Sequence, residues 1–309
     1  MSDGTIRSER RPCCNAEGSQ VPGLVSVWLT LDNPSKMNAY SQEMLQDITL
    51  DVNRASADPR VVAVVLTGAG DRAFCTGGDL EEYTREFLLK PQAFRAYLHH
   101  FTAALDALLA CDKPVINRVN GARVGGGQEL GMACDLSIAA EHAVFAQAGV
   151  KVGSAPIAGA AQWLPLYVGV ERATRACALC EKWTAAEALQ YGLISEVVPA
   201  PKKDGKADLS ALDAAVEKRV TEFMGFFPGS LTATLHALRR AKKKVWEEAR
   251  EGAVSWIANN AMTEANLGFR AFTQGKTPAE KQIDMVKLRH RLVDGRPWDD
   301  SILKDFGLG

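Results

Sequence analysis

The sequence has no run of about 18 apolar residues, the length that a helix needs to cross a membrane. Its first residues are polar and charged and lack the apolar segment of a secretory signal. The formal net charge is only −1, which argues against a basic surface for nucleic acid. We therefore expect a cytoplasmic protein with no membrane and no nucleic acid among its partners.

Motifs for metals and redox chemistry are also scarce. Seven cysteines, an odd number, lie in apolar contexts and predict reduced thiols. Cys177 and Cys180 match C-x-x-C, but they lie in an alanine-rich helical run without a second pair, which favours buried helix cysteines. The five histidines form no ligand spacing, and no Walker, H-E-x-x-H or G-x-S-x-G motif occurs. The sequence predicts no metal site.

Apolar patterning predicts an α/β protein. Residues 24–31 alternate as a strand, and residues 61–67 form a continuous apolar run, typical of a strand buried on both faces. Residues 91–110 carry apolar side chains at helical spacing. Strands alternate with helices over the first two thirds of the chain, and helices alone fill the last third. The pattern predicts an α/β core with a helical C-terminal extension.

Composition suggests three segments. Residues 1–22 show little apolar periodicity and contain several prolines and glycines, so we expect a loose N-terminal arm. Residues 23–200 are predicted to form the core. Residues 199–206 are basic and polar and form the best candidate for a linker, and residues 208–309 are predicted to be helical.

The first of two glycine-rich loops follows the strand at 61–67. Residues 68–73 match the dinucleotide fingerprint G-x-G-x-x-A. Two further glycines, Gly77 and Gly78, stand where the phosphate-binding helix should run, and the acidic residue expected about 20 positions later is missing. The sequence therefore argues against a nicotinamide dehydrogenase.

The second loop, residues 124–129, follows an apolar strand and opens a helix. Gly126 has no side chain, so its N–H can approach a ligand oxygen, and a helix N-terminus favours negative charge. Glu129 lies in the first turn, where a carboxylate suits proton transfer beside an oxygen that becomes anionic. The alternative is that the glycines allow close packing of strand and helix while Glu129 complements the helix dipole.

Together, residues 74–80 and 117–130 resemble the crotonase (enoyl-CoA hydratase/isomerase) superfamily, whose oxyanion loops read A-F-[SC]-x-G-x-D-L and N-G-x-x-x-G-G-G-x-[ED]-L. The likeness covers residues 24–200, with weaker agreement in the C-terminal helices. It implies a crotonase-like spiral of ββα repeats with a helical C-terminal region that forms homotrimers, which often pair as hexamers. It also implies an acyl-CoA thioester substrate, with no cofactor apart from the CoA of the substrate.

The resemblance implies a role for particular residues. The amides of Thr76 and Gly126 match the donors that bind the thioester oxygen, and Glu129 matches an acid/base glutamate. Residues implied to contact the substrate and its CoA are Lys36, Met37, Asn38, Ala39, Ala73, Cys75, Gly77, Gly78, Asp79, Gly125, Gln147, Gly149, Phe272 and Lys276. For Phe272 and Lys276 the alternative is a core aromatic residue and an exposed lysine.

A second acid/base group is not evident. Hydratases of this superfamily use two glutamates, and Gly149 occupies the place of the second. Asp79, Glu82 and Tyr83 lie just past the first loop and are candidates for the missing group. Their alternative roles are in helix capping or at the surface.

The reaction is predicted from longer matches. Residues 145–154 resemble the ring-closing dihydroxynaphthoyl-CoA synthases, but those enzymes lack a glutamate at Glu129. Residues 61–68, 113–121 and 268–272 resemble ring-opening hydrolases of cyclic 6-oxo-1-ene-carbonyl-CoA thioesters. In that group a long insertion follows the strand matching 195–198, and a histidine tends to stand in the place of Val152.

We therefore expect a ring-opening acyl-CoA hydrolase that adds water to the C=C bond and then cleaves a C–C bond, in the degradation of aromatic or alicyclic compounds. Three alternatives stay open: an enoyl-CoA hydratase or isomerase, a ring-closing lyase, and a catalytically silent CoA- or RNA-binding homologue.

Overall fold

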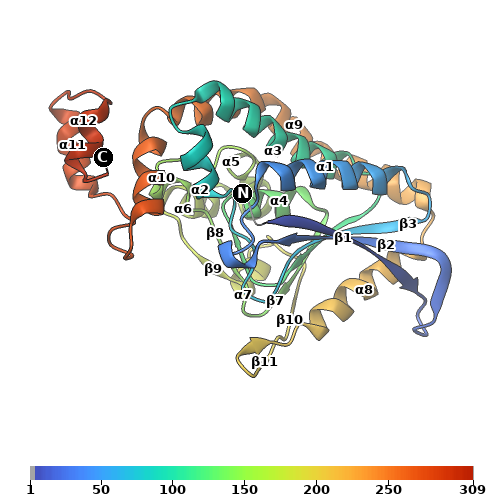
Figure 1. The fold of residues 1–309 in the computed structure, drawn as a ribbon. Coiled ribbons are helices and arrows are strands. Elements are labelled where there is room, and N and C mark those ends of the chain that lie inside the picture. The colour runs from blue at the N-terminus through green and yellow to red at the C-terminus, as the bar shows by residue number, and fades with distance from the viewer. Residues whose placement is uncertain (1–3, 309) are drawn as a thin grey trace.

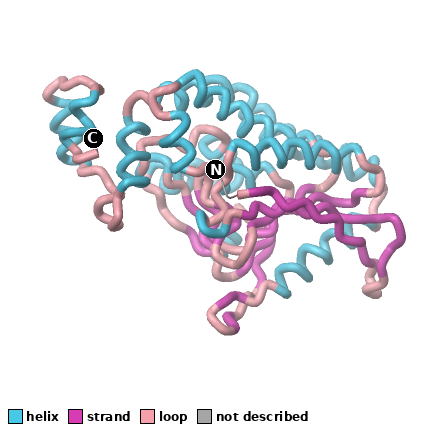
Figure 2. Tube along the Cα trace, in the orientation of Figure 1, coloured by secondary structure: helices cyan, strands magenta, loops and turns pink. Residues whose placement is uncertain are grey.

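The computed structural model describes residues 4–308, in which helices cover both faces of a central sheet (Figures 1 and 2). The larger sheet has six strands in the order β1-β2-β3-β5-β7-β10. Their bounds are β1 Thr5–Cys14, β2 Gln20–Asp32, β3 Val61–Gly68, β5 Val115–Val119, β7 Leu136–Ala140 and β10 Glu196–Val198. β1 is antiparallel to β2, and the other neighbours are parallel.

A second sheet of four strands runs beside the first in the order β4-β6-β8-β9. Its strands are β4 Ala73–Cys75, β6 Ala122–Val124, β8 Val144–Ala146 and β9 Trp183–Thr184. The consecutive pairs β3–β4, β5–β6 and β7–β8 each give one strand to each sheet, and helices follow each pair along the chain. This order confirms the predicted spiral of ββα repeats.

Three long helices lie together over one face of the larger sheet (Figure 1). They are α1 Gln42–Ala57, α3 Pro91–Ala110 and α9 Pro228–Asn260. α1 begins after Ser41, whose hydroxyl accepts a hydrogen bond from the Met44 N–H, as a capping residue does. Side chains of β3 alternate between faces: Val64 packs toward these helices and Val65 toward α8 (Ser210–Met224) on the other side. This burial on both faces explains the continuous apolar run.

The remaining elements are short. They are the 3-10 turns Pro34–Lys36 and Gly149–Lys151, α2 Leu80–Glu82, the π-helical turn Tyr83–Phe87, α4 Gly126–Ala133, α5 Ala160–Val168, α6 Val170–Ala178, α7 Ala185–Gln190, the hairpin strands β11 Lys202–Lys203 and β12 Lys206–Ala207, α10 Glu264–Gln274, α11 Met285–Val293 and α12 Asp300–Asp305. No helix within residues 4–308 is both long and apolar enough to span a membrane.

The prediction of a loose arm over residues 1–22 is wrong for β1, which pairs with β2 from Thr5 to Cys14. Most side chains of β1 are exposed, because the strand lies at the edge of the sheet and is held by main-chain hydrogen bonds. Arg11 also lies over the ring of Trp28, 3.7 Å from its centroid. An exposed edge strand has no apolar alternation, so the sequence pattern missed it. Residues 1–3 lie outside the described range.

The predicted separation of core and C-terminal region near residue 200 also needs correction. Leu212, Val216 and Val220 of α8 are buried with Trp28 and Val65 of the larger sheet, so α8 completes the core. Helices α11 and α12 stand apart from the core, at the end of the molecule that carries the C-terminus (Figures 1 and 2). They pack in a small cluster with Leu267 of α10. The trimerisation role of this region stays a prediction.

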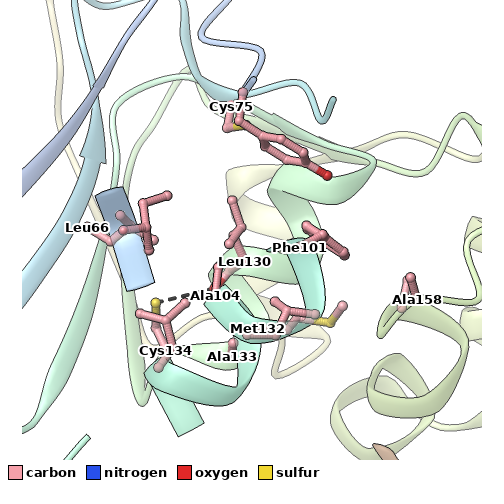
Figure 3. Close-up of a cluster of buried hydrophobic side chains, with 14 of the residues drawn as sticks. Leu66, Cys75, Phe101, Ala104, Leu130, Met132, Ala133, Cys134 and Ala158 are labelled. Atoms are coloured by element: carbon pink, nitrogen blue, oxygen red, sulfur yellow. Dashed lines mark hydrogen bonds between the residues drawn. The ribbon is translucent and has the colours of Figure 1, made fainter. Parts of the chain in front are cut away.

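Helix α4 lies in the centre of the protein, between α3 and the sheets (Figure 3). Leu130 and Met132 are buried among the apolar side chains labelled in the figure, and the Cys134 thiol donates to the Leu130 carbonyl. At its start, a Cβ on Gly127 would lie 2.2 Å from the Cys75 carbonyl oxygen. A glycine is required there, because α4 begins directly against the loop that leaves β4.

Candidate active site

The two glycine-rich loops meet at the backbone. β4 and β6 pair in parallel, which brings the residues that follow them together. Gly77 has a φ of 101°, and a Cβ there would lie 3.1 Å from the Gly126 nitrogen. Gly125 has a φ of 57°, and a Cβ there would lie 3.4 Å from the Thr76 carbonyl oxygen. Both positions favour glycine, and the contact fixes the main chain around Thr76 and Gly126.

The amides of Thr76 and Gly126 are available as hydrogen-bond donors. Within residues 4–308, neither N–H has an acceptor on the protein. Both residues line a cavity of about 660 Å³, a size that suits a small-molecule site. Gly126 is also the first residue of α4, so its N–H lies at the positive end of the helix dipole. The loops thus present two free donors to one cavity.

Most of the predicted contact residues line the same cavity. They are Lys36, Met37, Ala39, Gly77, Gly78, Asp79, Tyr83, Gly125, Gln147, Gly149 and Phe272, together with Thr76, Gly126 and Glu129. They come from the turn before α1, the loop after β4, the start of α4, the segment after β8, and α10. The structure therefore brings together residues from five separate parts of the chain.

Five predicted residues do not line the cavity: Asn38, Ala73, Cys75, Glu82 and Lys276. Asn38 is buried, and its side-chain amide donates to the carbonyls of Ala69 and Ala73, which holds the first loop in place. Cys75 is buried in β4, and burial raises the pKa of its thiol to about 12. Lys276 is exposed; Lys281 lines the cavity instead.

Glu129 contributes a buried carboxylate to the cavity that the two donors line. Its side chain is 5% exposed, and one carboxylate oxygen accepts the Ala160 N–H at 3.3 Å. Burial raises the pKa of Glu129 to about 8, and the Ala160 hydrogen bond only partly opposes this effect. A glutamate that titrates near neutral pH can both accept and release a proton during turnover.

The other carboxylates near the cavity are already engaged. Asp79 caps α2 by accepting the N–H groups of Glu81 and Glu82, and it pairs with Lys36 Nζ at 2.7 Å. Glu81 pairs with the same nitrogen at 2.8 Å. Glu82 lies outside the cavity and accepts the N–H of Gln42. Of the predicted second acid/base groups, only Tyr83 remains, and its hydroxyl donates to Tyr97 Oη at 2.9 Å.

Gly149 has no space for a carboxylate without a change in its loop. A Cβ there would lie 3.1 Å from the Ala155 carbonyl carbon and 3.2 Å from the Pro156 nitrogen. Both are backbone atoms, so they cannot move aside as a flexible side chain does. The two-glutamate arrangement is therefore absent from this cavity, as the sequence predicts.

The buried Glu129 is expected to make stability depend on pH. The pKa of Glu129 in the folded protein, about 8, lies above its ordinary value of 4.5. The stability that Glu129 contributes is therefore fully present below pH 4.5 and is lost as the pH rises through 8. Glu129→Gln should raise the free energy of unfolding at pH 9 by about 5 kcal/mol and have little effect at pH 4. Urea unfolding of the unaltered protein and of Glu129→Gln at pH 4 and pH 9 measures this change in the free energy of unfolding. The same difference between the two proteins at both pH values would contradict the prediction.

The sequence analysis missed Tyr40. This residue directly follows the predicted turn Lys36–Ala39, lines the cavity and is almost fully buried. The only available signal was its position between that turn and the cap of α1, which places it beside the first loop. The sequence alone does not show that the Tyr40 side chain reaches Gly126 and so enters the cavity.

Comparisons with known proteins agree with this architecture. The sequence profile described as enoyl-CoA hydratase/isomerase matches residues 25–252. The chain is 41% identical to a 6-oxocyclohex-1-ene-1-carbonyl-CoA hydrolase of Geobacter metallireducens, over 99% of this chain and 91% of the relative. It is 39% identical to an enzyme of the same name from Thauera aromatica, over 97% of this chain and 91% of the relative.

Among solved structures, an enoyl-CoA hydratase from Mycobacterium avium subsp. paratuberculosis K-10 superposes with a TM-score of 0.70 at 25% identity. The match covers 88% of this chain and 97% of that one. The alignment with the Geobacter relative is longer than this chain, 347 positions against 309 residues, so that relative carries inserted residues.

Proposed function

The chain belongs to the enoyl-CoA hydratase/isomerase family, and we propose that it opens the ring of 6-oxocyclohex-1-ene-1-carbonyl-CoA by hydrolysis. The single observation that supports this most strongly is the combination of two free amides with one buried carboxylate, Glu129, in a cavity where Gly149 stands in the place of the second hydratase glutamate. Three curated relatives, 35–41% identical over 96–99% of this chain, carry the name of that hydrolase.

In the first step the thioester oxygen accepts hydrogen bonds from the amides of Thr76 and Gly126. The Glu129 carboxylate removes a proton from a water molecule, whose oxygen forms a bond to C2 of the ring. The electron pair of the C1=C2 bond moves onto the thioester oxygen as an enolate. Protonated Glu129 then returns the proton to C1. The product is a 2-hydroxy-6-oxo ring thioester.

In the second step another water attacks the ring ketone at C6, again losing its proton to Glu129. The resulting tetrahedral group collapses to a carboxylic acid, and the C1–C6 bond breaks. Its electron pair passes to C1 and the thioester oxygen, and Glu129 protonates C1. The open-chain product is a 3-hydroxyacyl-CoA with a terminal carboxyl group. Both steps place negative charge on the same oxygen, so one pair of amides serves both.

The proposal extends to the setting of the enzyme. We propose that it works in the cytoplasm as a homotrimer or a hexamer of two trimers, without a cofactor, in the degradation of aromatic or alicyclic compounds. Phe272, which lines the cavity, and the exposed Lys276 are proposed to contact the CoA nucleotide. Lys281 lies 5.1 Å from the Phe272 ring centroid and adds a second positive charge there.

An assay with three thioesters tests the function. The purified protein is expected to convert 6-oxocyclohex-1-ene-1-carbonyl-CoA to an open-chain dicarboxylic mono-thioester, detected by mass spectrometry as the gain of two waters. Straight-chain crotonyl-CoA and the ring without a ketone should be much poorer substrates. Turnover of crotonyl-CoA with none of the cyclic compounds would instead support an enoyl-CoA hydratase or isomerase.

A further inference from the structure

The cavity contains two phenol groups that the mechanism above does not use. Among the titratable groups that line it, Asp79 and Glu81 are both paired with Lys36 in a single ion cluster. Lys281 lies over the Phe272 ring. The remaining proton-bearing groups near Glu129 are the hydroxyls of Tyr40 and Tyr83.

Tyr40 connects the two oxyanion loops. Its N–H donates to the Gly77 carbonyl at 2.9 Å, and its carbonyl accepts the Asp79 N–H at 3.0 Å, so its backbone is fixed to the first loop. Its ring stacks on Phe101 of α3, with centroids 5.4 Å apart (Phe101 is labelled in Figure 3). Its hydroxyl reaches the second loop, because a Cβ on Gly126 would lie 2.0 Å from Tyr40 Oη.

The Tyr83 hydroxyl lies within hydrogen-bond distance of the Tyr40 hydroxyl. It also lies against Gly78, where a Cβ would be 1.7 Å from Tyr83 Oη, and it donates to Tyr97. Burial raises the pKa of both the Tyr40 and Tyr83 phenols well above the ordinary value, and the neighbouring Tyr83 phenol raises the pKa of Tyr40 further. Both hydroxyls therefore remain protonated at neutral pH and act as hydrogen-bond donors. Tyr40 is the phenol that lies beside the Gly126 amide.

The proposed substrate needs a donor at this position. In 6-oxocyclohex-1-ene-1-carbonyl-CoA the ketone carbon C6 and the thioester carbonyl are both attached to C1. When the thioester oxygen is bound at Gly126, the ketone oxygen must therefore lie close to the same residue. A buried ketone oxygen without a hydrogen bond loses its interaction with water and is poorly activated for attack.

We propose that Tyr40 Oη donates a hydrogen bond to the ring ketone oxygen and is a catalytic residue for the C–C bond cleavage, an inference that rests on the proposed function. Attack of water at C6 moves the electron pair of the C=O bond onto this oxygen, and the Tyr40 hydroxyl stabilises the resulting charge. When the C1–C6 bond breaks, the pair returns to the C=O bond of the new carboxylic acid. The electrons of the broken bond go to the enolate held by the two amides. Water addition to C1=C2 gives an enolate that shares its charge between the thioester oxygen and the ketone oxygen. Attack at C6 instead places a full negative charge on the ketone oxygen, so the loss of the Tyr40 hydroxyl should slow the second step more than the first.

The test is Tyr40→Phe, which keeps the ring that stacks on Phe101 and removes only the hydroxyl. With 6-oxocyclohex-1-ene-1-carbonyl-CoA, the variant should still add the first water, and ring opening should slow by about 10²-fold. The 2-hydroxy-6-oxo ring thioester should therefore accumulate in a time course followed by chromatography. The matched control is Tyr97→Phe, which removes a buried hydroxyl that does not line the cavity and should leave the ratio of the two products unchanged.

Equal slowing of both steps, or a product ratio like that of the unaltered protein, would overturn the role of Tyr40. Failure of the unaltered protein to open the ring would instead overturn the proposed function, so the two failures are distinguishable. If Tyr40→Phe does not fold, the Glu129→Gln protein can be loaded with substrate carrying ¹³C at the ketone. An infrared ketone band lower than in an apolar solvent supports the hydrogen bond, and an unshifted band excludes it.

Discussion

Glu129→Gln is expected to lower kcat for ring opening by about 10²- to 10⁴-fold. Glutamine keeps the size of the side chain and can still accept the Ala160 N–H, but it cannot take a proton from water or return one to C1. No other carboxylate can replace it, because Asp79 and Glu81 are paired with Lys36 and Glu82 lies outside the cavity. Steady-state kinetics with the cyclic thioester measures the loss.

The pH dependence should identify the same group. In the free protein the pKa of Glu129 is about 8, so the carboxylate that accepts a proton from water is a minor form at pH 6 and the major form at pH 9. The value of kcat/KM should therefore rise with pH and level off above about 8. The remaining activity of Glu129→Gln should lack this rise.

A matched control uses Glu171→Gln. Glu171 also lies in the first turn of a helix, α6, but it is exposed and outside the cavity. Its substitution should change neither kcat nor the pH profile. If Glu129→Gln were as active as the unaltered protein with every thioester, Glu129 would have no catalytic role and the silent-homologue alternative would gain support.

The main-chain part of the site could be predicted from the sequence because glycine carries its own conformational signal. Gly77 and Gly125 have positive φ values and approach the opposite loop closely, and such positions exclude most other residues. The glycines that open the helix after the second loop therefore indicate a donor at Gly126, and the resemblance to the crotonase superfamily implies the second donor at Thr76. Glu129 could be predicted for the same reason, because its place in the first turn is fixed relative to those glycines.

Side chains that reach the site from elsewhere could not be predicted in this way. Tyr40 enters the cavity because its backbone pairs with Gly77 and Asp79, a contact between segments far apart in the sequence. Nothing in the local pattern of a single tyrosine before a helix cap records that pairing. Lys281, which takes the position at the cavity expected for Lys276, follows an irregular turn after α10 whose path depends on tertiary packing.

The same distinction between local sequence patterns and contacts across the chain explains which strands and helices could be predicted. β3 was predicted because its apolar run is buried by helices on both faces. β1 was missed because its stability comes from main-chain pairing with β2, which leaves no pattern in the side chains. The amphipathic pattern of α8 showed a helix, but not that its apolar face would close the second side of the sheet. Composition near residue 200 therefore suggested a domain boundary where packing is continuous.

Gly126→Ala is expected to lower kcat by about 10²- to 10³-fold, the usual cost of losing an oxyanion donor. The new Cβ would lie 2.0 Å from Tyr40 Oη and 2.9 Å from the ring carbon that bears it. The phenol is stacked on Phe101 and its backbone is bound to the first loop, so it cannot swing away freely. The start of α4 must therefore shift, and the Gly126 N–H no longer points to the place where the thioester oxygen binds.

Gly252→Ala provides the matched control for this change. Gly252 lies within α9, and a Cβ there would meet no atom within 4 Å. This substitution should leave kcat unchanged and stabilise the protein by about 0.5–1 kcal/mol, because alanine loses less backbone entropy in a helix. A thermal melt and kinetics on both variants separate damage to the oxyanion loop from a general effect of adding a methyl group. If Gly126→Ala folds and retains full activity, the Gly126 amide does not bind the thioester oxygen, and both steps of the proposed reaction lose their common source of stabilisation.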